Sequence, residues 1–159
     1  MNTSKLLNRA AKLPLARTMT SLHARLYRLT GGRFLPRWAG GTPVLSLTTT
    51  GRKSGQPRST AIIYVEDGET LVVMPSNAGS DDTPAWWLNL QANPEAEVQV
   101  KGERRRVRAR RATEDEHDRL WPRLKESYSG FEAYQDFTDR EQPIVLLEPL
   151  GSAGPGEGA

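Results

Sequence analysis

The sequence predicts a mainly β (α+β) protein in which antiparallel strands form a small barrel with helices at its rim. Two observations predict this fold: six stretches alternate with a period of two, and helical patterns interrupt them at two places. The chain has 159 residues, enough for one domain with a sizeable core. We therefore expect a barrel domain at residues 43–150 and a flexible tail at residues 151–159.

Residues 1–42 are expected to form a basic amphipathic helical segment. Apolar residues recur at helical spacing on both sides of Pro14, and Gly31-Gly32 ends the pattern. Eight of the chain's 22 Lys and Arg residues lie in this segment, whereas all 19 acidic residues lie beyond it. Two interpretations stay open. The segment lies on an anionic membrane surface, which we favour, or it packs on the barrel or on a partner.

The barrel strands follow in order and are separated by turn signals. Asp67-Gly68 and Lys101-Gly102 are typical of hairpin turns. The strands are expected at residues 43–50, 58–68, 69–77, 96–102, 103–113 and 143–150.

Two helices are predicted between the strands. In the first, at residues 83–94, Thr83 is expected to cap the helix and Pro84 to occupy its first turn. In the second, at residues 113–128, Thr113 and Glu116 have the spacing of a capping box. Residues 130–140 read as an aromatic but irregular segment.

The composition excludes several classes of chemistry. Because the chain has no cysteine, disulfides, thiolate metal sites and a Cys nucleophile are excluded. The two histidines lie far apart in sequence, which argues against a histidine-rich metal site or a His-based triad. The mean hydropathy of −0.61 favours a soluble, cytoplasmic protein, on the inner face of the membrane if residues 1–42 bind lipid.

A basic loop at residues 51–58, GRKSGQPR, joins the first two strands. Arg52, Lys53 and Arg58 supply three positive charges, and Gly51 and Gly55 are expected to turn backbone N–H groups inward. This pattern indicates a site for an anionic ligand. The alternative, a solvated hairpin tip, is about as frequent for a charge run taken alone.

The segment at residues 74–89 combines a polar loop with a helix that opens on two tryptophans. Aromatic rings beside backbone donors suit a planar polar ring system. A core position is the alternative for the tryptophans, and we favour it for Trp87 and Leu88. A competing site is the arginine-rich strand at residues 103–111, which could bind nucleic acid, although its alternation with Val107 and Ala109 suits a solvated strand face.

Taken in order, TTTGRKSGQPR, LVVMPSNAG, PAWWLNLQANPEAEVQV and PIVLLEP resemble the deazaflavin-dependent nitroreductase family. These actinobacterial reductases use reduced coenzyme F420 and also act as quinone reductases. The resemblance covers about residues 40–149 and implies a split β-barrel related to flavin-nucleotide-binding oxidoreductases. It implies an oxidoreductase that transfers a hydride from reduced coenzyme F420 to a menaquinone-like quinone, a nitroaromatic or an activated alkene. Flavin mononucleotide (FMN) is the alternative cofactor, and a homodimer is one state that such barrels adopt.

The resemblance also implies the residues of the site. The basic loop would hold the anionic phospholactyl–oligoglutamate tail of the cofactor through Arg52, Lys53, Ser54, Gly55, Gln56, Pro57 and Arg58. The deazaflavin ring would be lined by Met74, Pro75, Ser76, Asn77, Ala85, Trp86, Trp87, Leu88 and Asn89. The substrate would lie against Ser76, Tyr128, Phe131 and Tyr134.

The implied chemistry needs a proton or hydrogen-bond donor and no metal. Tyr134 is expected to donate to the developing oxyanion, assisted by Tyr128 or Ser76. Phe131 and Ile63 depart from the family's pattern, because tyrosines occupy both positions in a nitroimidazole-activating member. The more apolar pocket favours quinone-like substrates over nitroimidazoles.

Overall fold

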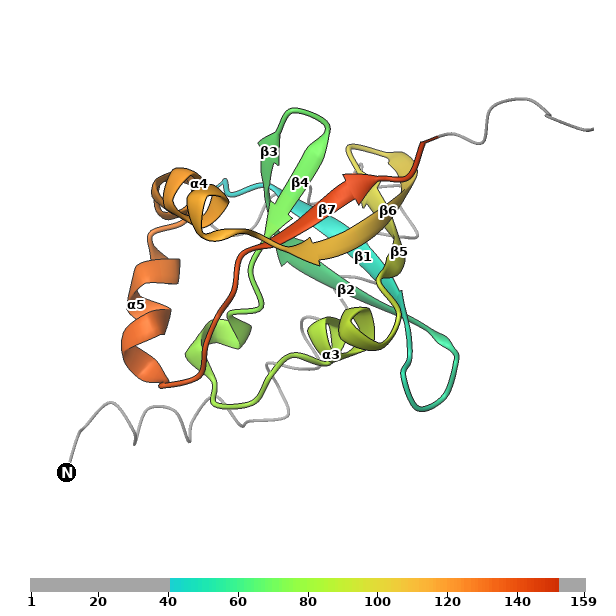
Figure 1. Cartoon of the computed structure of the whole chain (residues 1–159), viewed down its shortest axis with the longest axis horizontal. Coiled ribbons are helices and arrows are strands. Elements are labelled where there is room, and N and C mark those ends of the chain that lie inside the picture. The colour runs from blue at the N-terminus through green and yellow to red at the C-terminus, as the bar shows by residue number, and fades with distance from the viewer. Residues whose placement is uncertain (1–40, 152–159) are drawn as a thin grey trace, which may run out of the picture.

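The computed structural model describes residues 41–151, so the expected helical segment before them and the tail after Gly151 lie outside the described residues. Seven strands form one antiparallel sheet in the order β2-β1-β5-β6-β7-β4-β3, which curls around its own core (Figure 1). The strands are β1 (Val44–Thr50), β2 (Pro57–Ile63), β3 (Val65–Asp67), β4 (Thr70–Val73), β5 (Glu95–Val100), β6 (Glu103–Arg111) and β7 (Val145–Pro149). The predicted mainly β (α+β) class is confirmed.

The sheet curls because its two edge strands are neighbours in the chain. Only Tyr64 separates β2 from β3, and its side chain is 3% exposed in the barrel core. The prediction of one strand at residues 58–68 is therefore only partly right, since Tyr64 interrupts it and divides it into β2 and β3. The predicted strand at residues 69–77 ends early, at Val73, before Pro75 and a turn with positive φ angles.

The all-apolar strands are explained by burial on both faces of the sheet. In β4, Leu71 and Val73 face the barrel core, whereas Val72 packs in a second cluster on the opposite face. The second cluster brings Met74 and Leu146 against the two C-terminal helices. It contains Val72, Met74, Leu120, Leu124, Phe131, Ile144 and Leu146.

In the described part of the chain, three α-helices cover the sheet: α3 (Ala85–Ala92), α4 (Glu114–Ser127) and α5 (Gly130–Phe137). The capping box of α4 is confirmed, since the Glu116 N–H donates to the Thr113 hydroxyl and the Glu116 carboxylate accepts from the Thr113 N–H. The expected Thr83 cap is wrong, because α3 begins after Pro84 without a side-chain cap. No helix within residues 41–151 combines the length and apolar character needed to span a bilayer.

The segment at residues 130–140 was expected to be irregular, and that prediction is wrong. Residues 130–137 form α5, with Phe131 and Tyr134 on the side that meets the second cluster. Their spacing of three residues is the signal of a helix face, although the flanking glycine and the short length obscure it.

Candidate functional site

The turn between β1 and β2 is closed by its own backbone. The Gly51 N–H donates to the Gln56 carbonyl at 2.7 Å, and the Gly55 N–H donates to the Gly51 carbonyl at 2.7 Å. The N–H groups of the two glycines themselves are therefore used inside the turn. A Cβ on Gly51 would lie 2.6 Å from the Ser54 hydroxyl and 3.1 Å from the Gln56 carbonyl, so a larger residue there would force the turn to shift. The donors that remain for a ligand belong mainly to the side chains.

The three cations of this loop project into solvent without counterions. Arg52, Lys53 and Arg58 are all exposed, and none of them forms an ion pair within residues 41–151. Arg52 donates to the amide of Asn89 at 3.3 Å, and Arg58 donates weakly to the Ser54 hydroxyl at 3.5 Å. Three like charges on one hairpin repel each other, and an anionic ligand would relieve this repulsion.

The arginines of β6 provide the opposite case. Five of them face a carboxylate on a neighbouring strand or helix, whereas Arg105 is half-buried and its Nε forms no hydrogen bond within residues 41–151. The pairs are Arg104–Glu97, Arg106–Glu95, Arg108–Glu95, Arg110 with Glu116 and Glu148, and Arg111–Glu141. This neutralisation argues against β6 as a nucleic acid-binding strand, because phosphate contacts need free cations.

Asn89 connects the basic loop to α3. Its side chain is 3% exposed; Oδ1 accepts from the Arg52 N–H at 3.1 Å, and Nδ2 donates to the Thr49 hydroxyl at 3.0 Å. One buried amide thereby holds together β1, the start of the loop and the middle of the helix. Figure 1 shows α3 beside the protruding β1–β2 hairpin.

The two tryptophans of α3 differ from the expected arrangement. Trp86 is 8% exposed and, with Leu90, belongs to the barrel core, while Trp87 packs against that core and is half-buried. Leu88 is also half-buried and Ala85 is exposed. The expectation that Trp87 and Leu88 are the core residues is therefore wrong for Leu88 and only partly right for Trp87. The helix phase turns Trp86 inward instead.

The loop after β4 is a backbone feature of unusual geometry. Met74 and Pro75 are buried, Ser76 is half-buried, and Asn77, Ala78 and Gly79 have φ angles of 45°, 52° and 74°. Left-handed conformations cost about 1–2 kcal/mol for residues other than glycine. A Cβ on Gly79 would lie 3.0 Å from the Tyr134 carbonyl, so α5 packs directly against this turn.

The aromatic residues of the C-terminal helices form one group. The hydroxyls of Tyr128 and Tyr134 lie 2.8 Å apart, and the Tyr128 ring meets Phe131 edge to face at 5.2 Å. Burial, and secondly the hydrogen bond to Tyr128, raise the pKa of Tyr134, so its hydroxyl stays protonated. Phe131 is 2% exposed and lies in the second cluster, while Ile63 packs against the same cluster.

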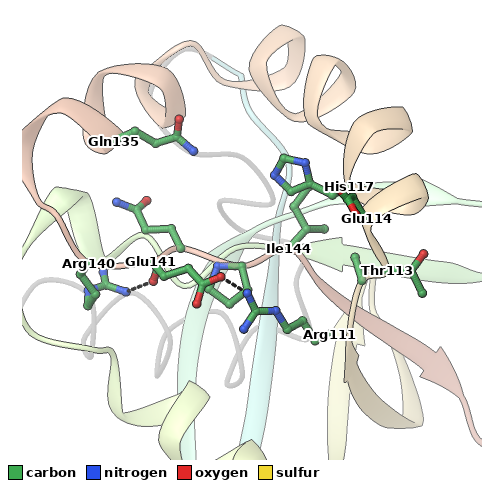
Figure 2. Close-up of a pocket in the computed structure, with 11 residues that line it drawn as sticks. Arg111, Thr113, Glu114, His117, Gln135, Arg140, Glu141 and Ile144 are labelled. Carbon is green, nitrogen blue, oxygen red and sulfur yellow. Dashed lines mark hydrogen bonds and ion pairs between the residues drawn. The ribbon is translucent and has the colours of Figure 1, made fainter.

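The structure thus gathers the expected site residues into two groups. One contains the loop at residues 51–58 with Asn89, and the other contains Met74, Tyr128, Phe131 and Tyr134, with Ser76 nearby. Figure 2 shows a separate cavity of about 480 Å³, which none of these residues line. Arg140 lies in the wall of this cavity, and sequence reasoning missed it. Its guanidinium group donates to the Ser76 carbonyl.

Comparisons with known proteins agree with this arrangement. A family model described as F420H(2)-dependent quinone reductase matches residues 19–149. An F420H(2)-dependent quinone reductase of Mycobacterium tuberculosis is 37% identical over 150 residues, which cover 92% of this chain and 98% of that protein. The solved structure of an F420-H2 dependent reductase (FDR-A) is 32% identical, with a TM-score of 0.62 over 67% of this chain and 94% of that chain. A second structure, described as a domain-swapped dimer, has the same identity and TM-score over 67% of this chain and 80% of that chain. These similarities confirm the predicted split β-barrel.

Proposed function

The chain belongs to the F420H(2)-dependent quinone reductase family, and from this premise we propose that it reduces a quinone with reduced coenzyme F420. The observation that carries the proposal is the set of Arg52, Lys53 and Arg58, which form no ion pair within residues 41–151 and whose loop Asn89 holds beside α3. The tail of coenzyme F420 carries a phosphodiester and several carboxylates. Clustered cations without counterions fit such a tail in charge and in the number of donors.

Two parts of the chain would hold the cofactor. The side chains of residues 52–58 would bind the tail, and the backbone of residues 74–77 with the residues of α3 from Ala85 to Asn89 would bind the ring. Trp86 and Phe131 are both buried, so they would act indirectly, by supporting the residues that reach the surface. When bound, reduced coenzyme F420 supplies a hydride with its electron pair.

The protein would supply hydrogen bonds and a proton to the acceptor oxygen. Tyr134 is suited to this role because burial keeps its hydroxyl protonated and Tyr128 lies 2.8 Å away to replace a donated proton. Ser76 is half-buried beside the same region and would be a second donor. A Tyr134→Phe variant should bind the cofactor normally but reduce quinones at least about 100-fold more slowly. Full turnover by this variant would refute the role of Tyr134.

The apolar character of the pocket favours a quinone over other acceptors. Ile63 packs against the same cluster as Tyr128 and Tyr134, so aliphatic surface and not a hydroxyl meets the acceptor there. Nitroaromatics and activated alkenes are secondary candidates. Steady-state rates with menadione, a nitroimidazole and an unsaturated lactone at equal concentrations would rank the three classes.

The first experiment is a fluorescence titration of the purified protein with coenzyme F420 and, in parallel, with FMN. We expect coenzyme F420 to bind more tightly, and its binding to weaken with added salt and in a Lys53→Ala variant, since surface charges are screened. Tighter binding of FMN would preserve the fold but refute the cofactor assignment. Binding of neither would return the basic loop to a solvated hairpin tip.

Two broader proposals concern where the enzyme works. The eight cations of residues 1–42 would bind an anionic membrane surface and bring the site to lipid-soluble quinones. Deleting residues 1–38 should then abolish binding to liposomes that contain anionic lipid, and unchanged binding would refute the idea.

A homodimer is proposed because one similar structure is described as a domain-swapped dimer, and light scattering would test it.

A further inference from the structure

Arg140, just after α5, holds both ends of the left-handed turn that follows β4. We infer that Arg140 is a positioning residue for the cofactor-binding loop: its guanidinium group fixes the backbone of residues 76–80 and thereby the placement of Ser76 and Asn77. The inference rests on the proposed function, because it takes residues 74–77 as the lining of the cofactor ring.

The contacts reach both ends of the turn. Nη2 of Arg140 donates to the Ser76 carbonyl at 3.0 Å, and Nε donates to the Ser80 carbonyl at 3.2 Å. A third N–H, on Nη1, donates to the Glu141 carbonyl at 3.3 Å and fixes the guanidinium group from its own side. Three donors of one planar group therefore bind three backbone carbonyls. A lysine ammonium group in this place could not match that geometry.

A second set of bonds ties the backbone of Arg140 to the same loop. Its N–H donates to the Thr138 hydroxyl at 3.1 Å, and that hydroxyl donates to the Asp81 carboxylate at 2.8 Å. The arginine is half-buried and forms no ion pair within residues 41–151. Its positive charge acts on the carbonyl dipoles, where a charge-assisted hydrogen bond is about twice as strong as a neutral one, and also interacts electrostatically with Asp81 and Asp82.

The turn needs such support because it is strained. Asn77 and Ala78 have φ angles of 45° and 52°, and each such residue persists only where its surroundings fix it. Inside the turn, the Gly79 N–H donates to the Ser76 carbonyl at 2.9 Å and the Ser80 N–H donates to the Asn77 carbonyl at 3.0 Å. Without the guanidinium group, the Ser76 and Ser80 carbonyls lose a partner and the turn can relax to other conformations.

Arg140 can also be reached from the solvent side. It lines the cavity of about 480 Å³ shown in Figure 2, together with Arg111, His117 and Gln135. A guanidinium ion is far smaller than this volume, so it can enter from the cavity and replace a deleted side chain. Arg111 lines the same cavity and pairs with Glu141, but its guanidinium group forms no hydrogen bond or ion pair with residues 76–80, which makes Arg111→Ala a matched control.

The test compares Arg140→Ala, Arg140→Lys and Arg111→Ala in the full chain, first without cofactor. Amide hydrogen exchange of the peptide that spans residues 74–82 should be at least about ten-fold faster in Arg140→Ala, with little change in the sheet core. Arg140→Lys should fall between Arg140→Ala and the wild type, and Arg111→Ala should match the wild type. Guanidinium chloride at low millimolar concentration should slow the exchange in Arg140→Ala only.

The same proteins are then titrated with coenzyme F420 and assayed with menadione. We expect the Kd of Arg140→Ala to rise about ten-fold and kcat to fall, with partial recovery by guanidinium. Wild-type exchange at residues 74–82 in Arg140→Ala, or an Arg140→Lys variant equal to wild type in exchange and in Kd, would overturn the inference. If Arg140→Ala exchanges faster but the wild type binds no coenzyme F420, the role of Arg140 in fixing residues 76–80 stands and the proposed function is refuted instead.

Should Arg140→Ala fail to fold, Arg140→Lys decides the outcome alone. It keeps the charge and most of the side-chain volume but cannot bond both carbonyls of the turn. A global loss of protection across the sheet in Arg140→Lys, with residues 74–82 affected no more than the rest, would show a purely structural role and overturn the inference.

Discussion

Replacing Asn89 by alanine should destabilise the fold and weaken cofactor binding together. The amide is 3% exposed and makes three hydrogen bonds, two with Arg52 and one with Thr49. The bond to the Arg52 side chain is long, at 3.3 Å, and lies toward solvent, so it contributes little. Loss of the other two bonds removes the Asn89 partner of the Arg52 N–H and of the Thr49 hydroxyl, and Thr49 is only 2% exposed. Together these losses cost about 2–4 kcal/mol of the free energy of unfolding.

Such a loss is a large share of the roughly 5–15 kcal/mol of a typical domain, so urea unfolding followed by tryptophan fluorescence will resolve it. We expect a lower midpoint with an unchanged dependence on denaturant concentration. In the variant, Arg52 no longer has its hydrogen bond to Asn89, so the basic loop is less ordered before binding. Binding of the cofactor tail must then order the loop, which reduces the affinity. The Kd for coenzyme F420 should rise about ten-fold at low ionic strength.

Asn93→Ala is the matched control, since it removes the same amide from the end of the same helix. Asn93 is exposed, and among residues 41–151 its Oδ1 accepts from the Glu95 N–H alone, at 3.2 Å. The control should lose less than about 1 kcal/mol of stability and bind the cofactor as the wild type does. A stability of Asn89→Ala within about 0.5 kcal/mol of the wild type would refute the hydrogen-bond reasoning. A destabilised variant with unchanged Kd would refute the coupling between the buried amide and the loop.

Three further predictions concern the turn, the surface and the aromatic pair. Gly79→Ala places a methyl group 2.9 Å from the Phe137 Cβ and 3.0 Å from the Tyr134 carbonyl at a φ of 74°, and should cost about 1–3 kcal/mol in urea unfolding, more than Gly68→Ala, whose Cβ meets nothing within 4 Å. The Arg119 pair lowers the pKa of Asp67 below 3.8, so its stabilisation is complete above that pH and lost as pH falls through the lowered value. Asp67→Asn should therefore cost about 1 kcal/mol in urea unfolding at pH 7 and nothing in strong acid. Burial raises the pKa of Tyr134 above 10.0, so the wild type loses stability as the pH rises above 10, where this tyrosine ionises in the unfolded chain. Tyr134→Phe should therefore lose less stability than the wild type over the same rise in pH, as measured by urea unfolding.

Local signals in the sequence were sufficient for most of the strands, for the turn at Lys101-Gly102 and for α4. Lys101 and Gly102 both have positive φ angles, 50° and 85°, as their pairing in a two-residue hairpin turn requires. Thr113 and Glu116 form the expected capping box because both partners lie within four residues of each other. Features of this kind depend on neighbours in the chain, and they can be read without knowing the fold.

Features that depend on distant contacts were not predictable. The strand after the basic loop divides at Tyr64, because the ring of this tyrosine is buried in the barrel core. The helix α5 is short, and its stability comes from packing on a cluster built by β4, β7 and α4. Arg140 has no local partner that suggests a function, since its bonds reach Ser76 and Ser80, about 60 residues earlier in the chain. Only the folded chain brings these groups together.

The meaning of the positive charges also depends on the fold. Arg106 and Arg108 share the Glu95 carboxylate because the register of β5 with β6 places it beside them, whereas β1 offers Thr49 and Thr50 beside the basic loop. The loop charges would act through the cofactor tail, and this attraction is screened by salt. Arg140 would act through hydrogen bonds to a half-buried turn, which salt screens far less. Loss of Asn89 should therefore reduce the salt dependence of cofactor binding, while loss of Arg140 leaves that dependence unchanged at a weaker affinity. Since Asn89 and Arg140 share no partner, a double variant should show the sum of the two free-energy losses.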